Sequence, residues 1–132
     1  ASHEAQFAVS GINLGLFCAT PAVALSRNIH PKHAMEMLLT GEFISPDKAQ
    51  NLGLINRVVP AEELTSATRE LANTISQKAR AAVRTGKAMF YPQLDMELGK
   101  AYEYASDHMV NNLKDADTQS GLNAFINKKS RN

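Results

Sequence analysis

The sequence has 132 residues and a formal net charge of +1 at pH 7, and 44% of its residues are hydrophobic. A chain of this length and composition is large enough for one globular domain with a core. The near-neutral charge gives no strong field for nucleic acid or for an anionic membrane, and there is no tryptophan for base stacking. No apolar run is long enough to span a bilayer, so we expect neither a nucleic acid nor a membrane as partner. The single cysteine excludes an internal disulfide framework.

The N-terminal part of the chain predicts two helices behind a short extended segment. Residues 6–9 predict a strand, and residues 10–15 predict a turn that contains two glycines. The alanine-rich stretch 16–28 predicts a helix with Pro21 near its start, and residues 30–40 predict a second helix. Because the first of these helices carries almost no charge, we expect most of its surface to be buried.

Residues 40–60 carry the sharpest local signals. Ser45 predicts a helix N-cap, and Pro46 stands where the first helical residue should be. Gly53 stands where the end of this short helix needs a left-handed residue. The apolar, β-branched stretch 54–59 then predicts a second short strand.

The remainder of the chain predicts helices from apolar stripes at helical spacing. Their expected ranges are 61–77, 79–90, 95–113 and from 117 into the C-terminal lysines. Pro92 is expected to stop the second of them, Asp95 to cap the third and Asp117 to cap the last. The sequence therefore predicts a mainly α chain with two short strands, an α+β arrangement.

Several sequence blocks also match one known protein family. Residues 40–60 follow the pattern T-G-x-x-I-S-x-x-x-A-x-x-x-G-L-x-x-x-V-V-P. The other blocks, A-Q-F before G-I-N-L-G, A-M-E-M-L-L and G-x-x-A-F-x-x-K-K, start at residues 5, 34 and 121. In this order they resemble the enoyl-CoA hydratase/isomerase (crotonase) family. Residues 11–21 are similar to its enoyl-CoA hydratase domain-containing subgroup.

The resemblance implies a fold and a division of the chain. It covers only the second half of the family's domain, which is a spiral of ββα turns followed by a helical trimerisation region. Residues 1–60 are then expected to form the end of the spiral core, and residues 61–132 the helical C-terminal trimerisation or lid region. A pair of short strands is not stable alone, so both strands are expected to be edge pieces of a larger sheet.

The resemblance also implies a ligand and a reaction. Family members bind acyl-CoA thioesters in fatty-acid metabolism, with hydratase or isomerase chemistry that uses two glutamates. The second glutamate normally stands immediately before I-N-L-G, where this chain has Gly11. Glycine cannot transfer a proton, so we expect no catalytic residue at this position. The nearest acid, Glu4, is more compatible with a solvated surface charge than with the role of the expected glutamate. Because the first half of the site is absent as well, we expect this chain alone to be inactive, whereas the resemblance implies that the parent protein is a hydratase-like lyase or isomerase. No cofactor is expected beyond the acyl-CoA ligand itself.

Five residues are candidates for acyl-CoA binding by this resemblance: Leu14, Leu16, Phe17, Phe125 and Lys128. The four apolar side chains are equally compatible with a place in the core. Lysine contacts phosphate as a point charge, but Lys128 is also compatible with a solubilising tail.

A metal site is not expected. His30 and His33 stand three residues apart, a spacing that two metal ligands can share, but no third ligand stands in a matching motif. Exposed polar side chains are the favoured interpretation of this pair. Cys18 has no catalytic context and is expected to be a small buried hydrophobe.

A second class of function is a non-catalytic helical module for oligomerisation or interaction. Its exposed apolar faces would drive oligomerisation or pairing with a missing N-terminal half. We expect self-association, as a trimer or a dimer of trimers, under either class of function. Acyl-CoA binding by the isolated chain would support the first class, and self-association without such binding would support the second. The sequence does not indicate a location, and the family resemblance suggests the mitochondrial matrix or the bacterial cytoplasm.

Overall fold

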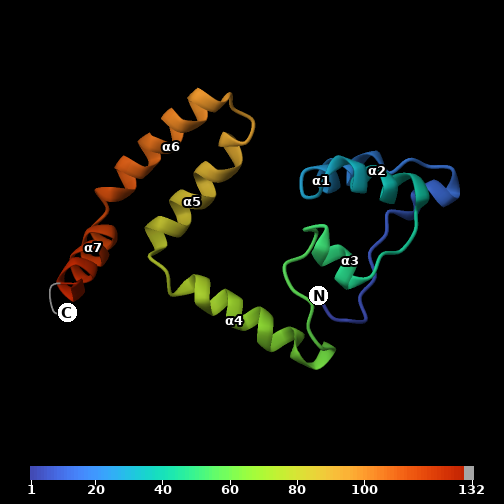
Figure 1. Ribbon diagram of the computed structural model, residues 1–132, viewed down its shortest axis with the longest axis horizontal. Coiled ribbons are helices and arrows are strands. Elements are labelled where there is room, and N and C mark those ends of the chain that lie inside the picture. The colour runs from blue at the N-terminus through green and yellow to red at the C-terminus, as the bar shows by residue number, and fades with distance from the viewer. Residues whose placement is uncertain (130–132) are drawn as a thin grey trace. The chain divides into compact units, whose positions relative to one another are not determined.

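The computed structural model describes residues 1–129, and side chains up to residue 127. This part of the chain is mainly α-helical, as expected, and none of its helices has the length and apolar character needed to cross a membrane. The chain divides into two compact units, Ala1–Arg69 and the part from Glu70 onward, and the division falls inside α4 (Figure 1). The expected boundary after residue 60 stays a prediction.

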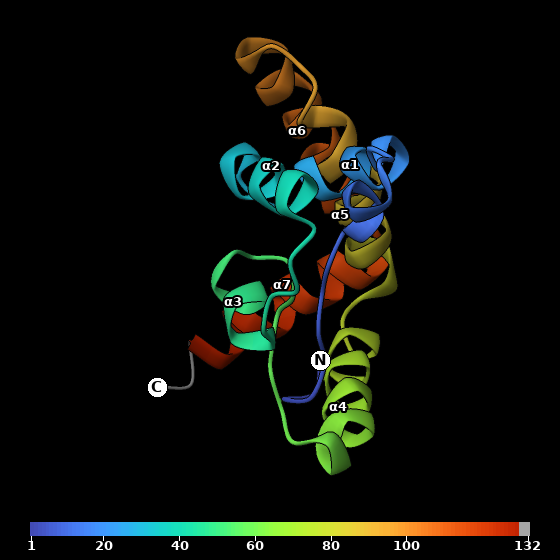
Figure 2. The same cartoon turned by 90° about the vertical axis from the view of Figure 1, so that its right-hand side faces the viewer.

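The first unit is built from short helices joined by extended segments. These are η1 (Ser10–Leu14), α1 (Ala19–Ser26), α2 (Pro31–Thr40), α3 (Pro46–Asn51), η2 (Ala61–Glu63) and the start of α4 (Leu64–Ser76). Both η1 and α1 contact α2, and α1 and α2 lie side by side in two views (Figures 1 and 2). The core lies where α1, α2 and α3 meet, and its buried members are Leu25, Ile29, Ala34, Met37, Leu38, Ile44 and Ala49.

The ends of α2 and α3 follow from their residues. The Ser45 hydroxyl oxygen accepts the Lys48 amide at 3.2 Å, and Pro46 is the first residue of α3, which confirms both predictions. Gly53 has a φ of 81°, the left-handed conformation expected after this helix. Gly41 ends α2 in the same way, with its amide donating to the Met37 carbonyl at 3.1 Å.

The two predicted strands are wrong as strands, because the described residues contain only isolated bridges. Phe7 pairs antiparallel with Ile44, through N–H···O distances of 3.2 and 2.8 Å, and Ser2 pairs parallel with Val59. Each extended segment has one partner residue and no third strand beside it, so neither bridge grows into a ladder.

Helix α1 is shorter and more exposed than predicted. It begins at Ala19 rather than residue 16, and Pro21 stands in its first turn, where proline is tolerated. Within it only Leu25 is buried, whereas Val23 is exposed. The expectation of a mostly buried helix is therefore wrong: in this unit α1 packs mainly against α2, which covers only part of its surface.

The second unit contains α5 (Arg80–Gln93), α6 (Leu98–Leu113) and α7 (Ala116–Lys129). Helices α5 and α6 form a hairpin (Figure 1), and both contact α7. Pro92 lies inside the last turn of α5 instead of stopping the helix before that point, and α5 ends one residue later, at Gln93. The predicted Asp95 cap is also wrong, since α6 begins at Leu98 with Glu97 as N-cap.

The start of α7 differs slightly from the prediction. The carboxylate of Asp115 accepts the Asp117 amide at 3.0 Å, and Asp117 itself lies in the first helical turn. A negative side chain in that turn complements the helix dipole.

Candidate functional site

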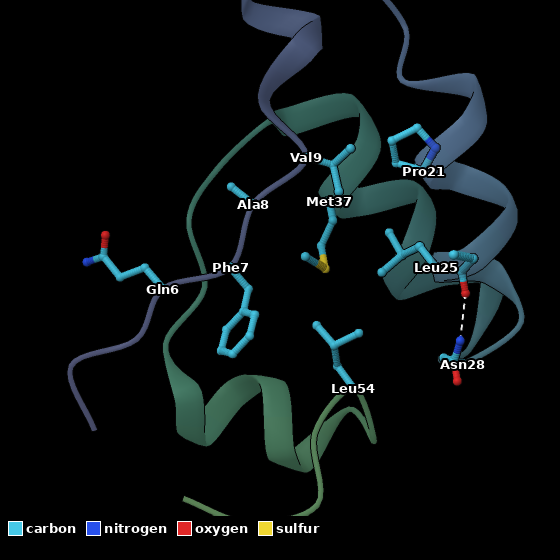
Figure 3. A pocket seen from close by; sticks show the side chains of 10 residues that line it. Gln6, Phe7, Ala8, Val9, Pro21, Leu25, Asn28, Met37 and Leu54 are labelled. Atoms are coloured by element: carbon cyan, nitrogen blue, oxygen red, sulfur yellow. Dashed lines mark hydrogen bonds between the residues drawn. The ribbon is translucent and has the colours of Figure 1, made fainter. Parts of the chain in front are cut away.

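The first unit holds an apolar cavity of about 410 Å³ (Figure 3). Its walls come from the N-terminal extended segment, from α1 and α2, and from the segment that follows α3. The lining residues are Gln6, Phe7, Ala8, Val9, Pro21, Ala24, Leu25, Asn28, Met37 and Leu54.

Local structure fixes the apolar walls of this cavity. The two hydrogen bonds between Phe7 and Ile44 hold the extended segment beside the core. The side chains of Phe7, Met37 and Leu54 point toward one another across the cavity (Figure 3). Met37 is buried, and Phe7 and Leu54 are partly buried and pack against the core. Most of this wall is therefore held by core packing.

The polar residues at the cavity offer no acid or base. The Asn28 side-chain amide donates to the Ala24 carbonyl at 2.8 Å, the dashed line in Figure 3. The Gln6 side chain is exposed and points away from the cavity centre. None of the lining residues carries a titratable side chain, so the cavity is suited to hold an apolar group rather than to transfer a proton.

Gly11, at the position where the sequence resemblance leads us to expect a glutamate, lies in η1. Its carbonyl accepts the Leu16 amide at 3.1 Å, and the Cys18 side chain folds back over the same point. A Cβ added at this position would overlap the Cys18 sulfur and would lie 2.9 Å from the Leu16 carbonyl oxygen. The backbone here accepts a glycine and leaves no room for a larger side chain unless Cys18 and the loop move.

Three of the predicted acyl-CoA-binding residues, Leu14, Leu16 and Phe17, do not line this cavity. Leu14 is 88% exposed, Leu16 66% and Phe17 44%, so in the first unit these side chains are not core. Phe125 is an exposed residue of α7 in the second unit. The Lys128 side chain lies outside the described residues. Their proposed contact with a ligand stays a prediction.

Sequence reasoning missed the residues that line the cavity. Phe7 closes the A-Q-F block and Met37 lies in the A-M-E-M-L-L block. These blocks indicate the family and a strand or helix, but neither indicates that the residue lines a cavity. Leu25 and Leu54 carry no signal that separates a cavity wall from ordinary core.

The histidine pair has structural partners. The His30 ring accepts the Lys32 amide at 3.3 Å and so caps α2, and its centroid lies 6.1 Å from that of His33. His33 lies 3.9 Å from a Glu36 carboxylate oxygen. The described residues contain no group of three His, Cys, Asp or Glu side chains placed to hold a metal ion.

Comparison with known proteins decides the family. The profile described as enoyl-CoA hydratase/isomerase matches residues 1–132. The chain belongs to the enoyl-CoA hydratase/isomerase family. The resemblance found in the sequence blocks is thereby confirmed.

Several members of this family are close in sequence. Over 129 residues the chain is 50% identical to enoyl-CoA hydratase domain-containing protein 3, mitochondrial, of Mus musculus, and 47% identical to that of Homo sapiens. Each alignment covers 98% of this chain and 43% of the relative. The crotonyl-CoA hydratase of Syntrophomonas wolfei is 29% identical, with 51% of its length covered.

Solved structures of family members have the same fold. An enoyl-CoA hydratase from Mycobacterium smegmatis matches with a TM-score of 0.94 and 49% identity, over 97% of this chain and 50% of that one. Human enoyl-CoA hydratase domain-containing protein 3 matches with a TM-score of 0.92 and 48% identity, over 97% and 51%. The chain therefore spans about half the length of the relatives that it matches, and it corresponds to their C-terminal half.

Proposed function

We propose that the protein binds an acyl-CoA thioester in fatty-acid metabolism and that the cavity of the first unit receives the acyl chain. The observation that carries this proposal is the apolar cavity of about 410 Å³ in a chain of this family. A cavity of this size falls within the range of small-molecule sites, and its hydrocarbon walls favour an alkyl group over a polar one.

The acyl chain length gives the first test. Calorimetric titration of the chain with CoA, butyryl-CoA and octanoyl-CoA measures how affinity changes with each methylene. Burial of a methylene contributes roughly 0.8 kcal/mol, so octanoyl-CoA should bind at least about tenfold more tightly than butyryl-CoA even if only part of the chain is buried. Equal affinities for the three compounds would remove the acyl-chain role.

A matched pair of substitutions separates the cavity from the exposed leucines near η1. Leu54→Phe adds volume inside the cavity, whereas Leu14→Phe adds the same volume at a side chain that is 88% exposed. We expect Leu54→Phe to weaken octanoyl-CoA binding and Leu14→Phe to leave it unchanged. The reverse result would move the acyl site to the exposed loop that contains Leu14.

We further propose that this chain does not hydrate enoyl-CoA by the glutamate chemistry of the family. Support comes from Gly11, which carries no proton-transfer group, and from the cavity lining, which carries none either. A crotonyl-CoA hydration assay should give no rate above a buffer control. A robust rate proportional to the amount of chain would overturn this proposal.

A second candidate function is a helical assembly module. Leu98, Tyr102 and Met109 stand at helical spacing along α6, and each is about 70% exposed. Such a stripe favours a homo-oligomer, a trimer or a dimer of trimers, or pairing with a segment that corresponds to the relatives' other half. Sedimentation that finds only monomer at high concentration would contradict self-association.

A mitochondrial location is the third part of the proposal. It is supported by the relatives described as mitochondrial, which are 40–50% identical to this chain. A tagged protein that stays outside mitochondria in cells would argue against it.

A further inference from the structure

A second cavity, of about 320 Å³, lies within the second unit, between the last residues of α4 and the first turns of α5. Two apolar side chains, one hydroxyl and three cationic side chains line it: Ile75, Ser76, Lys78, Arg80, Val83 and Arg84. The apolar cavity of the first unit shares none of these residues, so the two sites can be tested separately.

The cations of this cavity stand in a stretch without acids. Between Glu70 and Asp95 the sequence contains no Asp or Glu but four cations, which gives +4 locally in a chain of net charge +1. The salt bridges among the described residues join Glu36 to His33 and to Lys48. The cavity's Lys78, Arg80 and Arg84 therefore have no anionic partner in the part of the chain that the structure describes.

Helix stability does not explain the two arginines. Arg80 opens α5 and Arg84 lies one turn later, near the positive end of the helix dipole, where acidic side chains stabilise and cations do not. The first turn of α5 contains no acid, and its N-cap, Ala79, provides no side-chain hydrogen bond. Only Lys78, just after the end of α4, complements a helix dipole.

The lining of this cavity selects a small anion with an apolar part. Guanidinium groups match the oxygens of phosphate in a bidentate way, and a lysine adds a point charge. Ile75 and Val83 supply an apolar wall beside these cations. The volume lies at the small end of ligand sites, and no aromatic side chain lines the cavity for base stacking, so a small molecule is favoured over a nucleic acid.

We propose that Lys78, Arg80 and Arg84 bind the phosphate group of a small phosphate ester, whose carbon skeleton packs on Ile75 and Val83. The proposal does not depend on acyl-CoA binding in the first unit, because it rests on a different cavity and different residues.

The test is a nuclear magnetic resonance titration of the full ¹⁵N-labelled chain with phenyl phosphate, alongside inorganic phosphate and benzoate at equal ionic strength. Saturable shifts should concentrate at the amides of residues 75–84. Phenyl phosphate should bind more tightly than either partial mimic, because only it supplies both the phosphate and the apolar group. Shifts that do not saturate, or that spread over all cationic surfaces, would overturn the proposal.

Charge-matched variants make the test specific. The double variant Arg80→Gln/Arg84→Gln removes two cavity cations, and Lys87→Gln/Lys100→Gln removes two exposed cations that do not line it, so both variants have the same net charge. Loss of two charge-assisted contacts should weaken phenyl phosphate binding about tenfold or more in the first variant only. Equal weakening in both variants would mean general charge attraction and would refute the site.

Competition identifies the source of the phosphate. If CoA displaces phenyl phosphate from residues 75–84, the site holds a phosphate of CoA. If CoA leaves these shifts unchanged while phenyl phosphate still depends on the two arginines, the site serves a separate phosphate ester. The Leu54→Phe variant should bind phenyl phosphate normally in either case, so failure of the acyl proposal and failure of this one are distinguishable.

Discussion

The sulfur of Cys18 occupies the space that a side chain at Gly11 would need. A Cβ at that position would also lie 2.9 Å from the Leu16 carbonyl oxygen, in the loop that joins η1 to α1. A glutamate at position 11 would therefore need more than a single replacement. The loop around it is packed for glycine, and a carboxylate requires a rearrangement of at least Cys18 and Leu16.

The first prediction concerns the stability of Gly11 variants. Gly11→Ala should lower the free energy of unfolding by about 1–3 kcal/mol, the range for overpacking, as measured by urea denaturation. Cys18→Gly removes the overlapping sulfur. In the double variant Gly11→Ala/Cys18→Gly, the loss of unfolding free energy should therefore be smaller than the sum of the two single losses, and the difference is the coupling energy between the two positions.

A matched control for this experiment lies in α5. An added Cβ at Gly86 meets no atom within 4 Å, and the residue is helical, so Gly86→Ala should leave stability unchanged or raise it by up to about 1 kcal/mol. If Gly11→Ala were as stable as the unmodified chain, the close approach of Cys18 would carry no energetic weight.

The second prediction concerns activity. Gly11→Glu restores the residue type that the family resemblance leads one to expect, yet it should not create crotonyl-CoA hydration, because the Cβ alone already overlaps Cys18. Gly11→Glu/Cys18→Gly removes that obstacle and should be the better folded of the two variants by circular dichroism. Hydration by Gly11→Glu alone would show that the loop adapts at little cost.

Much of the helical fold was predictable because its signals are local. Ser45, Pro46 and Gly53 each set a helix end through their own hydrogen bonds or φ preference, and the structure places each as predicted. The apolar, extended segments 6–9 and 54–59 were harder. Whether such a segment becomes a strand depends on neighbours elsewhere in the chain, and here each finds only one bridging residue.

The candidate site was less predictable than the fold. Exposed Leu14 and buried Leu25 are both leucines beside small residues, and their sequence contexts do not say which one faces a cavity. The packing of α1 against α2 decides that, and it is a tertiary property. Similarly, the basic stretch after α4 is visible in the sequence, but only the turn into α5 places three of its cations around one cavity.

The third prediction compares two adjacent leucines of α2. Leu38 is 3% exposed in the core and Leu39 is 56% exposed. Leu38→Ala should cost about 2–5 kcal/mol of unfolding free energy, because it leaves a cavity among packed side chains. Leu39→Ala removes the same atoms from the next residue of the helix, on its exposed face. It should change the free energy of unfolding by less than about 0.5 kcal/mol. Similar losses of unfolding free energy for both variants would mean that Leu38 does not lie on the buried face of α2.

The fourth prediction concerns the cap of α3. Ser45→Ala removes the acceptor of the Lys48 amide and should cost about 1 kcal/mol in chemical denaturation. Ser106→Ala, at an exposed position inside α6, is the control and should be neutral or slightly stabilising, because alanine is the better helix former. An equal loss in both would show that the hydroxyl at position 45 does not act as a cap.

The last prediction separates backbone strain from steric contact at two glycines of positive φ. Gly15 has a φ of 76° with nothing within 4 Å of an added Cβ, whereas Gly41 has a φ of 62° and an added Cβ would lie 2.8 Å from the Ile12 side chain. Gly15→Ala should therefore cost only the left-handed conformation, about 1–2 kcal/mol. Gly41→Ala should cost more, because it also pushes η1 away from the end of α2, where the Asn13 amide donates to the Gly41 carbonyl at 3.5 Å.

The difference between the unfolding free energies of the two variants, measured by urea denaturation under the same conditions, reports how tightly η1 is held. A Gly41→Ala loss no greater than that of Gly15→Ala would show that the loop around Gly11 moves freely, which would also weaken the case that Cys18 bars a glutamate there.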